Sequence, residues 1–209
     1  FSAPTDFNGS EVFTISVTDG EYTDTQNITV TVNAVNDVPV ANATSATTNE
    51  DQSAVISLTG SDIDGDALTF SLASDATNGG VVIEGSLATY TPNLDFNGSD
   101  SFTFTASDGE LSSTANVSLT ITAVNDVPVL AAVLDVSFDE DGSSSVNLSG
   151  SDIDGDELTF SITSGTDITA SLSGSDVTFS APADYNGSEA FIISVTDGEY
   201  TDTQNITVT

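Results

Sequence analysis

The stretch best suited to chemistry is Asp62-Ile63-Asp64-Gly65-Asp66, which recurs unchanged at residues 152–156. Each copy sets three carboxylates within five residues, and the chain contains no Lys, Arg or His to neutralise them. Two like charges about 4 Å apart repel by roughly 1 kcal/mol in bulk water and by about 4 kcal/mol at an effective dielectric near 20. Several carboxylates on a flexible loop suit Ca²⁺ better than the rigid octahedron that Mg²⁺ requires. The pattern predicts a calcium site, and the alternative is a solvated turn, in which Asp and Gly are also favoured.

Composition excludes most other chemistry. The 209 residues include 33 acidic side chains, no basic side chain and no Cys, for a formal charge of -33. Without imidazole, thiol or ammonium groups, the usual general bases and nucleophiles are missing, so we expect no enzyme. Nucleic acid and anionic lipid are implausible partners because both are bound through Lys and Arg. With no disulfides, rigidity must come from the apolar core or from bound ions.

The sequence also bears on cellular context. No apolar run approaches the eighteen or so residues that span a bilayer, so we expect no membrane insertion in this segment. Phe1 opens in the middle of a repeating pattern, and we expect the chain to be an excerpt of something longer.

Internal repeats define the organisation. Val35-Asn36-Asp37-Val38-Pro39 recurs 89 positions later as Val124-Asn125-Asp126-Val127-Pro128. Residues 1–31 also match residues 179–209 everywhere except positions 5, 7, 12 and 14. Division at the Asn-Asp-Val-Pro signals predicts the C-terminal part of a repeat at 1–36, a complete repeat at 37–125 and a nearly complete one at 126–209. A Pro after each Asn-Asp keeps the joint extended.

Within a repeat the apolar residues have a period of two, which is typical of strands buried on one face. Leu68, Phe70 and Leu72 alternate with polar residues, and so do the runs Phe102–Ala106 and Val117–Ile121. About seven such strands in roughly 89 residues, with no helical periodicity, predict an all-β fold of tandem Greek-key β-sandwiches, cadherin-like or immunoglobulin-like, in a linear array.

Five motifs in fixed order carry a family resemblance. They are NED at 49–51, DIDGD at 62–66, LDFNGSDSFTF at 94–104, ASDGE at 106–110 and AVNDVP at 123–128. Together they resemble a cadherin-like repeat, and more narrowly the VCBS-type repeats that run in tandem through large bacterial surface adhesins. The resemblance implies a secreted or cell-surface protein whose neighbouring repeats share calcium ions at their junctions.

The resemblance also implies the ligands of each ion. At the first junction they are Asn36, Asp37, Asp62, Asp64 and Asp108. At the second they are Glu50, Asp51, Asn125, Asp126, Asp152, Asp154 and Asp197, while Glu140 belongs to a third. Asp66 and Asp156 have no counterpart in the family pattern, but they complete the two carboxylate triplets. The family pattern leaves between one and three ions per junction.

Two functions fit these observations. The first is a calcium-stiffened structural or adhesive module, acting as an extended stalk. The second is a binding module, either homophilic with other copies in a fibre or specific for carbohydrate, and possibly appended to a secreted enzyme.

Overall fold

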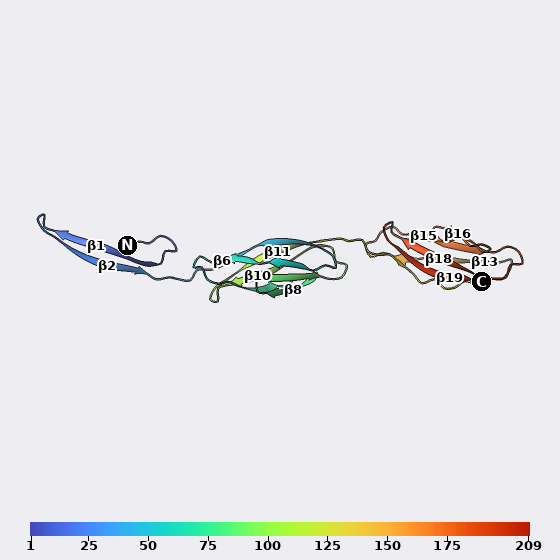
Figure 1. Ribbon diagram of the computed structural model, residues 1–209, viewed down its shortest axis with the longest axis horizontal. Helices are drawn as coiled ribbons and strands as arrows, with labels where there is room; N and C mark the ends of the chain where they lie inside the picture. The colour runs from blue at the N-terminus through green and yellow to red at the C-terminus, as the bar shows by residue number, and fades with distance from the viewer. The chain divides into compact units, whose positions relative to one another are not determined.

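The computed structural model describes residues 1–209 and is built entirely from strands and their connections (Figure 1). It divides into two compact units, Phe1–Ala123 and Val124–Thr209. Each is described by itself below. The structure contains no helix that is long and apolar enough to span a membrane.

The first unit opens with a hairpin of β1 (Gly9–Thr18) and β2 (Thr23–Val32), blue in Figure 1. The strands pair antiparallel from Gly9 opposite Val32 to Thr18 opposite Thr23. The Asp19 carboxylate forms the turn by accepting the backbone N–H groups of Glu21 and Tyr22 at 2.9 and 2.8 Å. These hydrogen bonds, the one from Tyr22 first, hold the pKa of Asp19 below its usual value.

The rest of the first unit has two larger sheets. One has the order β4 (Thr44–Asn49), β11 (Ser112–Thr122), β10 (Gly98–Ser107) and β7 (Thr69–Ser74), in which β4 runs parallel to β11. The other has the order β5 (Ala54–Ser57), β9 (Leu87–Pro92) and β8 (Gly79–Glu84). The first unit also contains a short antiparallel pair, β3 (Val40–Asn42) with β6 (Thr59–Ser61).

The second unit repeats this arrangement. One sheet has the order β15 (Thr159–Ile162), β18 (Glu189–Thr196) and β19 (Thr201–Val208), and Val136 pairs parallel with Val208 where β4 pairs with β11 in the first unit. The other has the order β13 (Ser143–Asn147), β17 (Asp176–Ser180) and β16 (Thr169–Ser173). The short pair is β12 (Val129–Leu130) with β14 (Gly150–Ser151).

Alternate side chains of the central strands form the two cores. Phe102 and Phe104 of β10 pack with Val117 of β11 in the first unit, and Phe191, Ile193 and Ile206 do so in the second. The predicted all-β tandem sandwich is therefore confirmed. Leu72 departs from the predicted alternation because it is 37% exposed on β7, an edge strand that the opposite sheet covers only in part.

A polar contact ties the two sheets of the first unit together. The Asp100 carboxylate on β10 accepts the backbone N–H groups of Thr77 and Asn78 at 3.1 and 2.8 Å, and the buried Tyr90 hydroxyl donates to it at 3.1 Å. Burial, followed by the hydrogen bond to Asp100, raises the pKa of Tyr90 far above its usual value. Asp100 thus holds the loop before β8 against the core.

We expect Tyr90→Phe to destabilise the first unit by about 1 kcal/mol, since it removes one hydrogen bond to a carboxylate but leaves the ring in the core. Calorimetric unfolding checks this, with the second unit as internal reference because its equivalent position is already Phe179. An unchanged first transition would show that the hydroxyl contributes nothing.

Candidate metal centre

The aspartate-rich loop of the first unit lies between β6 and β7, and its own backbone shapes it. Asp62 Oδ1 accepts the N–H of Asp64 at 2.9 Å and, at 3.4 Å, that of Asp66. Gly65 has φ +85°, a left-handed conformation that glycine adopts without strain. Asp64 Oδ2 accepts the N–H of Asp37 at 2.9 Å, so the loop is closed by the Asn-Asp segment.

The second unit builds the same loop independently. Asp152 Oδ1 accepts the N–H groups of Asp154 and Asp156 at 2.9 and 3.3 Å, and Asp154 Oδ2 accepts the N–H of Asp126 at 2.8 Å. Gly155 has φ +80°. The geometry therefore follows from the shared sequence.

Each loop is suited to a hard cation. Asp62, Asp64 and Asp66 can each offer one carboxylate oxygen within 4.8 Å of the others, and Asp152, Asp154 and Asp156 do the same. Two oxygens bound to one Ca²⁺ at 2.3–2.6 Å are at most about 5 Å apart, so this spacing is compatible with a shared ion.

One oxygen in each loop lacks any partner within the protein. Asp62 Oδ2 and Asp152 Oδ2 are buried and accept no hydrogen bond. A buried polar atom without a partner costs about 1–3 kcal/mol, more when it is charged. A bound cation would remove that cost, and the same atom lacks a partner in both copies of the loop.

Asn36 and Asn125 connect each loop to the last hairpin of its unit. The Asn36 amide donates to Asp108 Oδ2 at 3.0 Å, and the Asn125 amide donates to Asp197 Oδ2 at 2.9 Å. The other oxygen of Asp108 accepts the N–H groups of Glu110 and Leu111, both at 2.7 Å. Asp108 and Asp197, predicted as ligands from the resemblance, thus orient the two asparagines in this structure.

The pKa values reflect these contacts. Hydrogen bonds from the backbone of Leu111 and Glu110 hold the pKa of Asp108 below its usual range. For Asp197, burial opposes ionisation, but hydrogen bonds from Asn125, Glu199 and Tyr200 outweigh it and lower the pKa. Burial and then the neighbouring charge of Asp64 raise the pKa of Asp37. Both causes disfavour the charged form of Asp37.

The remaining predicted ligands lie at the opposite end of each unit. The N–H of Glu50 donates to the carbonyl of Thr122 at 3.0 Å, at the end of β11, whereas Asp108 lies just before its start. Eleven residues of strand separate the two ends by about 35 Å. Asp51 Oδ1 accepts the N–H of Asp95 there, at 3.1 Å.

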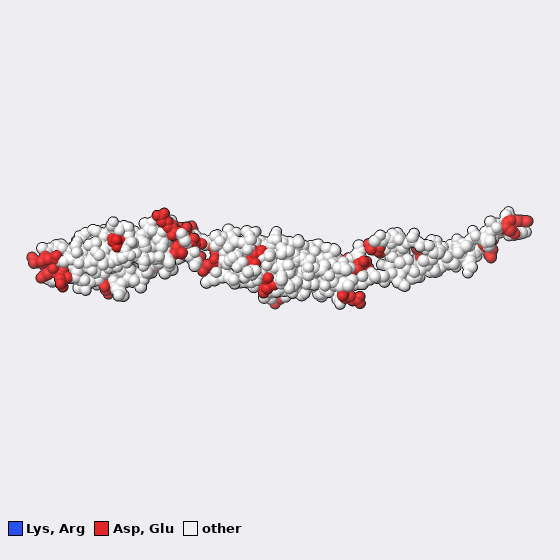
Figure 2. All heavy atoms as spheres, turned by 180° about the vertical axis from the view of Figure 1, so that it is seen from behind, with Lys and Arg blue, Asp and Glu red and all other residues white.

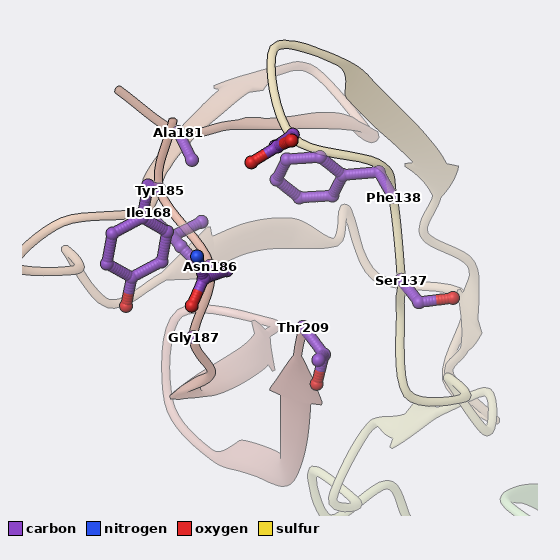
Figure 3. Close-up of a pocket in the computed structure, with 9 residues that line it drawn as sticks. Ser137, Phe138, Ile168, Ala181, Tyr185, Asn186, Gly187 and Thr209 are labelled. Atoms are coloured by element: carbon purple, nitrogen blue, oxygen red, sulfur yellow. The ribbon is translucent and has the colours of Figure 1, made fainter. Parts of the chain in front are cut away.

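Glu140 has the equivalent position in the second unit. The N–H of Phe138 donates to the carbonyl of Thr209, just after β19, so Glu140 lies past that end while Asp197 precedes the start of the strand. Glu140 lines a hollow of about 450 Å³, together with Phe138 and Tyr185, which come from different segments (Figure 3).

Figure 2 shows the carboxylates gathered in clusters with uncharged surface between them and no basic side chain beside them. Each unit therefore has the aspartate-rich loop at one end and further acidic residues, Glu50 and Asp51 or Glu140, at the other.

Sequence reasoning missed one functional position, the acidic residue directly after each Asn-Gly-Ser. In the second unit, Glu189 accepts the N–H groups of Thr166, Asp167 and Ile168 at 3.0, 2.8 and 3.2 Å. Asp100 does the equivalent work in the first unit. The signal was present, because an acidic residue follows Asn-Gly-Ser at positions 11, 100 and 189.

This position predicts a pH-dependent difference in stability. Hydrogen bonds from the backbone, the one from Asp167 first, lower the pKa of Glu189. A carboxyl whose folded-state pKa is lowered stabilises the fold above its unfolded pKa of about 4.3, and this contribution is lost as the pH falls through the folded value. We expect Glu189→Gln to lower the unfolding midpoint of the second unit at pH 7, and this effect should shrink as the pH falls below the unfolded pKa.

Glu11→Gln is the matched control, because it removes the same charge from nearly the same sequence in the hairpin. Calorimetry from pH 3 to pH 7 measures both variants. A difference of equal size at every pH would show that the charge of Glu189 is irrelevant.

Comparison with known proteins agrees with the fold. Protocadherin gamma B7 extracellular cadherin domains 1–4 align over 95% of this chain and 57% of their own, with 19% identity and a TM-score of 0.60. Mouse protocadherin-24 domains EC1–3 align over 95% of this chain and 79% of their own, with 16% identity and a TM-score of 0.56. At this identity the likeness concerns the fold alone.

A third structure is an endo-fucoidan hydrolase from glycoside hydrolase family 107, with 20% identity and a TM-score of 0.39 over 98% of this chain. The chain spans only 34% of that enzyme, and the low score carries no argument for an activity. No curated protein matches the chain in sequence. The family model described as "Bacterial Ig domain" matches residues 36–120 and again residues 125–209. The chain thus belongs to the bacterial Ig domain family and carries two copies of that domain in tandem.

Proposed function

We propose that the chain is a calcium-stiffened structural or adhesive module of a large extracellular bacterial adhesin or surface fibre, acting as an extended stalk. The observation that supports this most strongly is the buried, unpartnered oxygen of Asp62 and of Asp152. Both lie in loops whose carboxylates are close enough to share an ion.

The choice of calcium follows from the donor set. The chain has no His and no Cys, so the nitrogen and sulfur ligands that zinc and copper prefer are missing. Ca²⁺ takes six to eight oxygen ligands in flexible geometry, which suits several carboxylates on one loop, whereas Mg²⁺ demands a near-ideal octahedron. The ion would be held by the aspartate triplet, with Asn36 and Asp37 or Asn125 and Asp126 completing each site.

The stiffening follows from where the acidic groups lie. Only three residues, 123–125, separate Thr122, which binds the backbone of Glu50, from Asp126, which closes the next aspartate-rich loop. Under this proposal, so short a connection would let acidic groups of successive repeats approach one another, and they would repel without a cation. A shared ion would convert that repulsion into a joint that resists bending. The partners are then neighbouring repeats of the same chain, as the cadherin resemblance implies.

An enzymatic role is not proposed. Domains of the immunoglobulin and cadherin types are not usually catalytic, and the acidic groups of this chain recur in each unit at loop positions. A stalk gains reach by adding repeats, which fits a sequence that carries two copies of one domain in tandem.

Calcium titration by calorimetry tests the proposal. We expect the parent chain to bind calcium, Asp62→Asn to lose the ion held by the first loop, and the double variant Asp62→Asn/Asp152→Asn to lose both. Glu84→Gln removes one exposed charge from β8, which is not part of the aspartate-rich loop, and is the matched control. Binding that survives in the double variant would disprove the assignment.

A further inference from the structure

The hairpin β1–β2 is a second, uncovered copy of the hairpin β18–β19. Residues 1–31 and 179–209, which contain the two hairpins apart from Val32, differ at only four positions. Their registers agree: Glu11 lies opposite Val30 as Glu189 lies opposite Val208. The burial of the same side chains is very different. Phe191, Ile193 and Val195 are 0–1% exposed, whereas Phe13, Ile15 and Val17 are 36%, 54% and 68% exposed.

The second unit shows what covers this face. Residues 126–178 supply β15, which pairs with β18, and most of the opposite sheet. The next residue, Phe179 of β17, packs on Phe191 with ring centroids 5.4 Å apart. The hairpin retains the last part of this arrangement, because Phe1 packs on Phe13 with centroids 4.9 Å apart. Phe1 thus packs on Phe13 as Phe179 packs on Phe191.

Glu11 specifies part of the partner. Its equivalent, Glu189, accepts three consecutive backbone N–H groups from the loop between β15 and β16. In the hairpin, Glu11 lines a hollow of about 290 Å³ together with Phe1, Phe13 and Val30. The hollow thus combines an apolar wall with a carboxylate that can accept the same loop.

The loop must also fit the longer side chain of glutamate. Gly165 lies so close to Glu189 and Phe191 that a Cβ atom there would collide with the carbonyl oxygen of Ile168 and with Glu189 Oε2. The first unit has Asp75 at the equivalent position. Its acidic residue is the shorter Asp100, and the Tyr90 hydroxyl reaches across to it. In the second unit, Phe179 and Glu189 therefore occur together with Gly165. In the first unit, Tyr90 and Asp100 occur together with Asp75 at the equivalent positions.

We propose that the apolar face of hairpin β1–β2 takes as its partner a polypeptide segment with the strand pattern of residues 126–178, which would cover the hairpin as that segment covers β18 and β19. The hairpin carries Phe1 and Glu11, so it matches the segment that contains Gly165 and not the one that contains Asp75. This inference is independent of calcium.

The test adds a second copy of residues 126–178 in front of Phe1 of the full chain. Residues 37–89 form the matched control, since they have the same length but carry Asp75. Hydrogen exchange followed by mass spectrometry reports on β1 and β2. We expect the backbone amides of both strands to exchange on the order of a hundredfold more slowly with the 126–178 extension, and much less so with the control.

A variant of the extended chain keeps the test decisive. Glu11→Gln should return most of the lost exchange rate, because the loop would lose its carboxylate acceptor, and Asp75→Gly in the control should increase protection. Equal protection by both extensions, or none by either, would overturn the proposal. Protection of β1 and β2 in the unextended chain together with dimers in sedimentation would also overturn it, since a second copy would then cover the face.

Discussion

Saturating calcium is expected to raise the thermal unfolding midpoint of each unit by roughly 10–20 °C over its value in chelator. A ligand at a hundredfold excess over its dissociation constant stabilises the folded state by about 2.7 kcal/mol. For a domain of this size, each kcal/mol shifts the midpoint by about 4–8 °C. The ion would also relieve the repulsion between carboxylates and give the buried oxygens of Asp62 and Asp152 a partner.

The two loops should respond differently. Asp62→Asn is expected to reduce the calcium shift of the first unit and to leave that of the second. Asp152→Asn should abolish the shift of the second unit and also reduce that of the first, because the ion proposed at its loop is shared across the joint. Scanning calorimetry with and without EDTA measures both transitions in one experiment. Midpoints that are the same in calcium and in EDTA would contradict the calcium assignment.

Phe191→Ala should destabilise the second unit by about 3–5 kcal/mol, the usual cost of removing a fully buried aromatic ring from a core. That is a large share of the 5–15 kcal/mol by which a domain is stable, so the midpoint should fall by at least about 12 °C. Phe13→Ala makes the same change in nearly the same sequence, where the ring is only partly covered.

The hairpin variant is expected to leave both calorimetric transitions within about 1 °C of the parent, since an exposed face contributes little to a cooperative transition. Because Phe13 and Phe191 lie in nearly the same local sequence, the difference between the two variants measures the effect of burying the ring. If Phe13→Ala lowered a transition as much as Phe191→Ala does, the face of β1 would have to be buried in solution.

The sequence predicted the fold class because strands buried on one face leave a period of two in the chain. The prediction held for Phe102, Phe104 and Val117, which lie on central strands. It was too generous for Leu72, since the alternation cannot show which strand ends at an edge. The same limit applies to the hairpin, where the pattern of Phe13 and Ile15 is that of a core but its covering is absent.

The candidate site was predictable in its local part. Asp62, Asp64 and Asp66 are so close in sequence that a turn brings them together, and the structure places them within reach of one ion. Other contacts join residues that are far apart in the sequence. Asn36 and Asp108 are 72 positions apart, and Glu189 is 21–23 positions from the N–H groups that it accepts. Which backbone N–H groups face a given carboxylate depends on how two sheets pack, and no spacing within one strand shows it.

Small-angle X-ray scattering of the full chain, in calcium and after chelation, tests the stiffening most directly. With calcium we expect a narrow distribution of conformations and a long maximum dimension. Chelation should broaden the distribution and shorten the mean span, and Asp62→Asn/Asp152→Asn should behave in calcium as the parent does in EDTA. Scattering curves of the parent that superimpose under both conditions would contradict the account.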